Sequence, residues 1–331
     1  MKQEPKTLQQ AIVYFSNPAN CREYLVARRW PDGVVTCPRC GSANVLFLEK
    51  YNRWHCREKH PAPQFTLKTG TIFEDSPLGL DKWLTAMWQI VNCKNGISSY
   101  EVHRAIGITQ KSAWFMDHRI RLALGIGHTG KMSGECEADE TFIGGKARNM
   151  HMDVKKRRIT ATGPKDKTAV MGILERGDSG NNKIKHSKVR TAVIPDRKKK
   201  TLQAEVKTNV QAGAALYSDA LLSYDGLERD YAHQVVDHAV EYVRGKVHTN
   251  GLENFWSLFK RGINGTYVSV EPFHLFRYLD EQEFRFNNRG TRKAPITDGQ
   301  RFDLAVRQIV GKRLTYKELT GKTLENPRAP F

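Results

Sequence analysis

Several features are absent from this chain of 331 residues, and each absence excludes a class of protein. No run approaches the roughly 18 consecutive apolar residues of a membrane span, and the first residues lack the apolar core of a secretory signal. We therefore expect a cytoplasmic protein without membrane contact. The six cysteines are too few for a disulfide scaffold of this length. The sequence has neither a GxxxxGK[ST] phosphate loop nor an HExxH motif, which argues against NTP-driven chemistry and against a zinc enzyme for small molecules.

Acidic residues are scarce relative to basic ones: 35 Asp and Glu stand against 53 Lys and Arg, a formal charge of +18. This excess favours a polyanionic partner such as nucleic acid, although charge that only aids solubility is the alternative. Residues 146–167 hold eight basic and two acidic residues, and residues 181–200 hold eight and one. Such blocks predict a binding face, although solvated loops would have the same composition. The first block includes Lys155, Lys156, Arg157 and Arg158.

Hydrophobic residues make up 39% of the chain, enough for two or three folded domains. The first residues have helical periodicity, and short strand-like runs among Cys, Gly and Pro follow them. Helical periodicity then resumes, and after it strands and helices alternate, a pattern typical of a three-layer α/β domain. We expect five segments: N-terminal helices (1–30), a metal-stapled module (31–75), a helical region (76–128), an α/β domain (129–290) and a helical tail (291–331).

A metal site is indicated near the N-terminus. Cys37 and Cys40 form a CxxC knuckle, fifteen residues separate Cys40 from Cys56, and His60 follows four positions later. Three thiolates and an imidazole suit tetrahedral Zn²⁺, and the intervening stretch is long enough for the hairpin of a zinc ribbon. His55 is the rival for the fourth position, although ligands at adjacent positions 55 and 56 would strain the geometry more.

Residues 97–121 predict two short helices joined by a tight turn. Ser98 can cap the first helix with Glu101 in the capping-box position, Gly107 can supply the turn, and Thr109 can cap the second helix. This pattern is typical of a helix-turn-helix that contacts DNA, although a purely structural hairpin has the same form. The face expected to meet DNA carries Gln110, Lys111, His118, Arg119 and Arg121.

Acidic residues mark a second candidate metal site. Strand-like alternation predicts that one face of the strand near residue 139 carries Glu135, Glu137, Asp139 and Thr141. Acids that share a face are tolerated more readily when a cation neutralises them. Asp219 ends a buried apolar run, and Glu253 lies near the start of an amphipathic helix. With Asn250 as N-cap, Glu253 would be a capping-box glutamate. Alternatively, carboxylates from two strands and a helix can converge on two Mg²⁺ or Mn²⁺ ions, as in sites that cleave phosphodiesters.

The motifs together resemble a known family. The strings are CPRCG from Cys37, KTGTIFEDS from Lys68, ADET from Ala138 with GGK after it, SD at 218–219, and HTNGLENFWSLFKRG from His248. In their order and spacing they resemble the bacterial insertion-sequence transposases of the ISXO-like DDE branch. The resemblance runs from about residue 31 to residue 288.

This resemblance implies an α/β fold: an RNase H-like domain with a mixed five-stranded sheet flanked by helices, preceded by a zinc ribbon and a helix-turn-helix that bind terminal inverted repeats. Asp139, Asp219 and Glu253 fall on the DDE positions and would hold two catalytic Mg²⁺ or Mn²⁺ ions. His60 departs from the family's pattern, in which the last ribbon ligand is commonly a cysteine.

The activity implied is metal-dependent cleavage at DNA 3′ ends followed by strand transfer. The partners would be double-stranded DNA, at the element's ends and in the target, and further copies of the chain assembled on it at the nucleoid. Lys260 and Arg261 would contact the DNA backbone, unless they belong to a solvated helix face. Two alternatives stay open: a non-catalytic DNA-binding regulator built from the same modules, and a nuclease or resolvase that lacks strand transfer.

Overall fold

The protein forms two compact units, each described here by itself. One unit takes the described residues up to Gly125 together with those from Ile296 onward, and the second takes those in between. The described helices include none with the length and apolarity that a bilayer crossing requires. The basic residues at 155–158 lie outside the described part of the chain. The computed structural model describes residues 4–125, 127, 130–144, 167–177, 186–219, 221–236, 247–291 and 294–321.

The core of the first unit forms around α3, whose Trp83 and Trp88 are buried. The C-terminal segment completes this core, because the ring of Phe302 lies 5.6 Å from that of Phe15 and 5.0 Å from that of Trp88. Burial of such aromatic rings contributes a large share of a unit's stability. The helices are α1 (Leu8–Phe15), α2 (Pro18–Arg29), α3 (Leu80–Asn92), α4 (Ser99–Ile106), α5 (Gln110–Leu124), α10 (Asp298–Val306) and α11 (Tyr316–Leu319).

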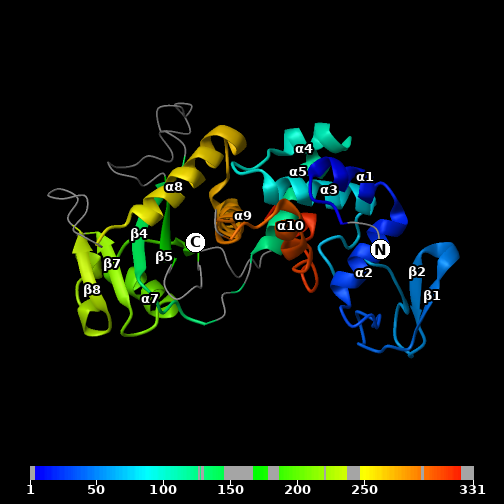
Figure 1. The fold of residues 1–331 in the computed structure, drawn as a ribbon, viewed down its shortest axis with the longest axis horizontal. Helices are drawn as coiled ribbons and strands as arrows, with labels where there is room; N and C mark the ends of the chain where they lie inside the picture. The colour runs from blue at the N-terminus through cyan, green and yellow to red at the C-terminus, as the bar shows by residue number, and fades with distance from the viewer. Residues whose placement is uncertain are drawn as a thin grey trace. The chain divides into compact units, whose positions relative to one another are not determined.

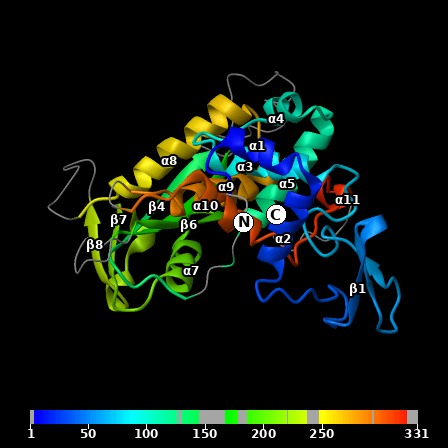
Figure 2. The same ribbon diagram turned by 45° about the vertical axis from the view of Figure 1, so that its right-hand side comes forward.

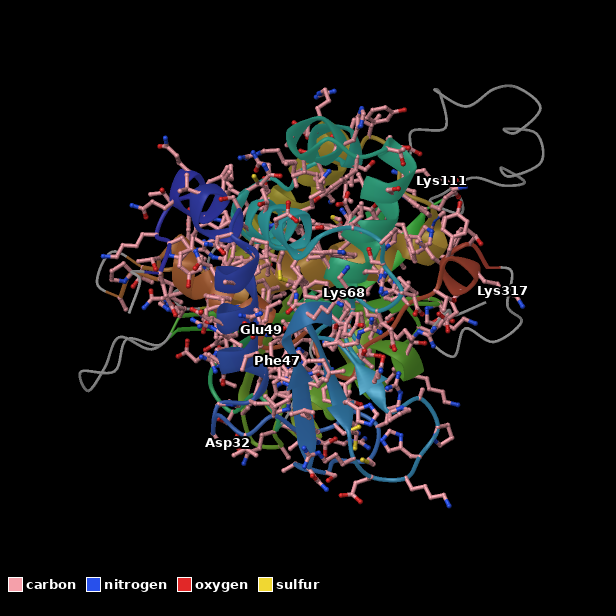
Figure 3. The ribbon with its side chains drawn as sticks, turned by 90° about the vertical axis from the view of Figure 1, so that its right-hand side faces the viewer. Asp32, Phe47, Glu49, Lys68, Lys111 and Lys317 are labelled. Atoms are coloured by element: carbon pink, nitrogen blue, oxygen red, sulfur yellow. The ribbon has the colours of Figure 1, made fainter. Side chains whose placement is uncertain are left out.

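A small antiparallel sheet lies in the same unit, in the order β1-β2-β3 (Figure 3). Trp54 on the central strand packs against Phe47, labelled in Figure 3, and Phe65, with ring centroids 4.8 and 5.8 Å away. The hairpin expected between the second and third cysteines is therefore present. Its strands are β1 (Val45–Leu48), β2 (Arg53–Cys56) and β3 (Gln64–Phe65).

The helix pair α4 and α5 forms as the local sequence predicts. Ser98 and Glu101 make the capping box of α4, and the Thr109 side chain accepts the Ser112 N–H at the start of α5. Gly107 ends α4 with φ of 61°, a left-handed conformation that glycine adopts without steric cost.

The second unit is built on a five-stranded sheet in the order β6-β5-β4-β7-β8. Strands β4, β5 and β6 pair antiparallel, whereas β4, β7 and β8 pair parallel. A mixed five-stranded sheet flanked by helices is thus confirmed. The strands are β4 (Cys136–Ile143), β5 (Thr168–Glu175), β6 (Lys188–Ile194), β7 (Ala215–Asp219) and β8 (Ala232–Val236).

Helices cover both faces of this sheet (Figures 1 and 2). On one face, Leu202 and Val206 of α7 pack in a cluster with Cys136 and Ala138 of β4. On the other face, α8 and α9 pack in a cluster with Val170 of β5. Alternate residues of each strand thus enter opposite cores, as the pleat requires. The helices are α7 (Lys199–Asn209), α8 (Asn250–Gly262) and α9 (Leu275–Asn287).

Candidate functional site

The four residues expected to bind zinc lie together, with their ligand atoms all within 4.8 Å of one another. The Cys37 Sγ lies 3.6 Å from the His60 Nε2, and the Cys40 Sγ lies 3.6 Å from the Cys56 Sγ. Ligands on a tetrahedral zinc, at about 2.3 Å for sulfur and about 2.0 Å for nitrogen, are separated by about 3.5 to 3.8 Å. The donor set and spacing therefore fit Zn²⁺.

The choice between His60 and His55 is decided by position. His60 belongs to the cluster, whereas His55 lies on β2, paired with Leu46 and Gln64. The His60 Nδ1 lies 2.8 Å from the Pro61 carbonyl oxygen. A proton on Nδ1 would be donated to that carbonyl, which leaves Nε2 as the lone-pair donor, the arrangement common for metal-bound histidine.

Carboxylates also gather at the edge of the second unit's sheet. The parallel pairing of β4 with β7 matches Cys136 with Leu216 and Glu137 with Tyr217. Asp139 and Asp219 each lie two residues further along, so this register brings them side by side. Glu140 joins them: one oxygen from each of the three carboxylates lies within 4.8 Å of the others.

The electrostatics of this cluster disfavour three negative charges without a cation. Burial, and then the charges of Glu140 and Asp219, raise the pKa of Asp139 to about 7. Burial also raises the pKa of Glu140. The Glu140 Oε1 is buried and has no hydrogen-bond partner. An all-oxygen donor set with an unsatisfied buried oxygen fits a hard divalent cation such as Mg²⁺ or Mn²⁺.

Asp139 is held in place by two donors. Its Oδ1 accepts the Glu140 backbone N–H at 2.8 Å, and its Oδ2 accepts the Trp256 indole N–H at 3.0 Å. Trp256 reaches this position because Gly172, the β5 partner of Asp139, has no side chain. A Cβ on Gly172 would lie 2.7 Å from the Trp256 Cζ2 and 2.9 Å from the Leu252 Cδ2. The glycine thus allows α8 to lie close against the sheet beside Asp139.

The start of α8 is fixed from the sheet and not by its own N-cap. Asn250 is the first residue of the helix and Thr249 is its N-cap, without a side-chain cap, so the alternative of a capping box formed by Asn250 and Glu253 is not borne out. Instead the buried Glu137 of β4 accepts the Leu252 N–H at 3.0 Å. An anion at a helix N-terminus satisfies an unpaired donor and the helix dipole together.

Glu137 is itself neutralised. The Arg176 Nε donates to it at 2.7 Å, and a second nitrogen of Arg176 donates to the His248 carbonyl at 2.7 Å. Glu137 is 1% exposed, and a charge so deeply buried needs such a partner. Glu137, expected on the same strand face as Asp139, thus anchors α8, whereas Glu135 is 37% exposed and lies 3.4 Å from Arg176.

Glu253, the third acid that the resemblance implies, does not belong to the carboxylate cluster. It is exposed on the first turn of α8, three residues before Trp256. Trp256, and not Glu253, is the α8 residue that reaches Asp139. Lys260 and Arg261 are exposed in the last turn of the same helix.

The face of α5 expected to meet DNA is largely buried, which corrects that expectation. Arg119 is 4% exposed, lies over the Trp83 and Phe115 rings, and donates to the Glu74 carbonyl. His118 and Arg121 are buried as well. The cause is that α5 packs on several sides, so its basic residues become core groups.

Two residues of that face remain accessible. Gln110 is half-buried and donates to the Ser99 hydroxyl, which links α5 to α4. Lys111 is exposed and its Nζ lies 4.9 Å from the centre of the Tyr316 ring on α11. Figure 3 labels Lys111 together with Lys317 of α11.

Sequence reasoning missed Glu140, Trp256 and Gly172. Strand alternation assigned Glu140 to the face opposite Asp139 and so excluded it. The position of Trp256, one turn after Glu253, was the available signal. An aromatic residue on the apolar face of an amphipathic helix is, however, also typical of the hydrophobic core. Nothing local marks Gly172, because the need for glycine there comes from a helix that follows eighty residues later.

Comparison with known proteins gives two family matches. Residues 131–287 match the ISXO2-like transposase domain, and residues 16–58 match the transposase zinc-ribbon domain. The first match covers the strands that carry Asp139 and Asp219, and the second covers three of the four zinc-ligand candidates.

Two curated relatives agree with these matches. An "uncharacterized protein in transposable element ISH50" from Halobacterium salinarum is 26% identical over 291 residues, which cover 83% of this chain and 92% of that protein. An "uncharacterized transposase-like protein" from Haemophilus influenzae is 31% identical over 102 residues, 30% of this chain and 82% of that protein. No solved structure matches the chain significantly. With the zinc-ribbon cluster and the paired aspartates in place, these matches show that the chain belongs to the ISXO2-like transposase family.

Proposed function

We propose that this chain is a DDE transposase that binds the terminal inverted repeats of an insertion sequence and catalyses metal-dependent 3′-end cleavage and strand transfer. The observation that carries the proposal is the convergence of Asp139 and Asp219, 80 positions apart in the sequence, at one edge of a sheet. The order and directions of its strands support an RNase H-like class for this sheet.

Asp139, Asp219 and Glu253 would hold two Mg²⁺ or Mn²⁺ ions. Bound ions of this kind supply Lewis-acid activation of a water and charge stabilisation at a leaving 3′ oxygen. The chain's own groups arrange the ligands: the Trp256 indole and the Glu140 N–H orient the two oxygens of Asp139. Orientation by fixed donors keeps a ligand ready without reorganisation during the reaction.

Two phosphoryl transfers account for the reaction without ATP. In the first, a water oxygen bonds to the phosphorus at the element's end and the bond to the 3′ oxygen breaks, which leaves a 3′-OH. In the second, that 3′-OH bonds to a phosphorus of target DNA and displaces a target 3′ oxygen. The second step conserves the number of phosphodiester bonds, in agreement with the absence of a phosphate loop from the sequence.

DNA contacts are assigned to basic and polar groups around the two sites. Lys260 and Arg261, exposed on the helix that packs beside Asp139, would neutralise backbone phosphates near the scissile bond. Gln110 and Lys111 at the start of α5 would contact the inverted repeat, together with the ribbon. We assign the block at 155–158 to phosphate contact on its charge alone. Pairing of two ends predicts a homo-oligomer on DNA.

Incubation of the protein with labelled duplex carrying the DNA that flanks its gene tests the proposal. With Mg²⁺ we expect a nick that leaves a 3′-OH, followed by a joined product when target DNA is added. Binding without a nick would replace the transposase by a DNA-binding regulator. Nicking that never yields a joined product would indicate a nuclease or resolvase.

A further inference from the structure

The carboxylate that completes the cluster around Asp139 and Asp219 comes from an unexpected position. Glu140 follows Asp139 directly on β4, and neighbouring residues on a strand point to opposite faces. Its oxygen nevertheless lies within 4.8 Å of oxygens of both aspartates. Glu253, by contrast, is exposed on α8 and outside this group.

The end of the pairing between β4 and β7 explains how side chains from both faces of β4 reach the same point. The pairing of β4 with β7 ends at Glu137 and Tyr217, and the three acids follow beyond it. There the two strands are no longer joined by ladder hydrogen bonds, so a side chain from the second face can bend around the strand margin. Asp139 belongs to the face covered by α8, as its bond to Trp256 shows. Glu140 comes from the face where Tyr224 is packed.

Two buried polar groups at this point have no hydrogen bond of ordinary geometry. One is the Glu140 Oε1, and the other is the hydroxyl of Tyr224, whose side chain is 0% exposed. The two residues nevertheless interact: burial, then the charge of Glu140 and a side-chain hydrogen bond with it, raise the pKa of Tyr224 well above its usual value, with smaller contributions from Asp219 and Asp139. Buried polar atoms are almost always satisfied in folded proteins, and a buried carboxylate is satisfied by a counter-ion.

Among the described residues, the cation that acts on Glu140 is Arg197, and it is poorly placed to neutralise the cluster. Arg197 lowers the pKa of Glu140, but less than burial raises it. Its guanidinium lies over the Phe142 ring at 4.7 Å and the residue is exposed. Within the described part of the chain, the three acids therefore lie close together without an ion pair to a basic side chain, as a site for a cation from solution requires.

We propose that Glu140 is a ligand of the divalent cation bound by Asp139 and Asp219, so that the first ion is held by three carboxylates of the sheet and does not depend on Glu253. This inference rests on the proposed function, because it assigns a further ligand to the same centre. It divides the four acids into two groups. Asp139, Asp219 and Glu140 bind an ion in the free protein, and Glu253 acts only at the second ion.

Binding of Mn²⁺ to the zinc-loaded full-length protein, followed by electron paramagnetic resonance without DNA, tests this division. Glu140→Gln keeps the size of the side chain and removes its charge, and Glu135→Gln, at a partly exposed acid just before β4 and outside the cluster, is the matched control. We expect Glu140→Gln to weaken Mn²⁺ binding by roughly tenfold to a hundredfold, as loss of a metal-site group does. We expect Glu135→Gln to stay within about twofold of the wild type, and Glu253→Gln to keep the first Mn²⁺ ion and to weaken only the second.

Further variants keep each outcome decisive. Circular dichroism and a thermal melt show whether Glu140→Gln folds. If it does not, Glu140→Asp replaces it: this variant keeps the charge on a shorter side chain and should bind Mn²⁺ with an affinity between those of the wild type and a protein without the carboxylate. Wild-type affinity in Glu140→Gln or Glu140→Asp, alongside a loss in Asp139→Asn, would overturn the role of Glu140 and leave the proposed function standing. A wild-type protein that binds no Mn²⁺ would reject the metal centre, and the proposed function with it.

Discussion

Replacement of Gly172 by alanine should lower the metal affinity of the candidate centre, although Gly172 lies on β5, which carries none of the acids of that centre. The new Cβ would lie 2.7 Å from the Trp256 Cζ2, whereas carbon atoms in contact prefer about 3.5 to 4.0 Å. Trp256 must therefore move by about 1 Å. A displacement of this size is enough to break the 3.0 Å hydrogen bond between its indole and the Asp139 Oδ2.

The energetic consequence follows from the same contact. Overpacking of a core costs about 1 to 3 kcal/mol, which corresponds to a fall of roughly 3 to 10 °C in the melting temperature of a unit of this size. Differential scanning calorimetry measures the loss of stability, and Mn²⁺ titration measures the loss at the centre. Gly265→Ala is the matched control, because a Cβ there meets nothing within 4 Å, and it should be neutral in both assays.

A second change separates packing from hydrogen bonding. Trp256→Phe removes the outer indole atoms that clash with a Cβ at position 172, but it also removes the donor to Asp139. The double variant Gly172→Ala with Trp256→Phe should regain stability relative to Gly172→Ala, while Mn²⁺ affinity stays low. A Gly172→Ala protein with wild-type stability and Mn²⁺ affinity would refute the close fit of α8 against β5.

Three further predictions concern the other parts of the molecule. Metal analysis of the purified protein should find one zinc per chain, and Cys56→Ser should lose it together with the fold of the ribbon; a chain that holds no zinc would contradict this. Burial raises the pKa of Asp303, but hydrogen bonds from Arg307 and Arg28 outweigh this effect, and the net pKa is lowered. The stabilisation by its charge is therefore fully present above the ordinary pKa of about 4 and is lost as the pH falls through the lowered pKa. Asp303→Asn weakens the 2.6 Å ion pair with Arg28 and should lower the free energy of unfolding by about 1 to 3 kcal/mol at pH 7, and by progressively less below pH 4. Thermal melts at several pH values measure this loss, and a loss independent of pH would exclude the ion pair as its source. Replacement of Lys260 and Arg261 by alanine should flatten the slope of log K against log salt for DNA binding by up to about 2, and an unchanged slope would place DNA elsewhere.

Local features of the fold could be predicted from the sequence because their causes are local. The capping residues Ser98 and Thr109 and the turn at Gly107 act within a few residues of themselves, and each lies where its chemistry requires. The zinc cluster was predictable for a related reason: a metal fixes its ligand types and their short spacing, and Cys37 and His60 meet both conditions.

Features that depend on distant packing could not be predicted. Helical periodicity shows that α5 has a polar side, but not that other helices bury Arg119 there. The cap of α8 comes from Glu137, more than a hundred residues earlier, so the local candidate at Asn250 was misleading. Glu140 reaches the two aspartates only because a strand pairing ends just before it, and a register of this kind is set by the tertiary structure.

The most direct test of the account compares the wild type with Asp139→Asn on one labelled end-DNA duplex. We predict that both proteins bind the duplex with similar affinity, and that only the wild type nicks it when Mg²⁺ is added. Nicking by Asp139→Asn at the wild-type rate would contradict the assignment of Asp139 and Asp219 as the centre of the chemistry.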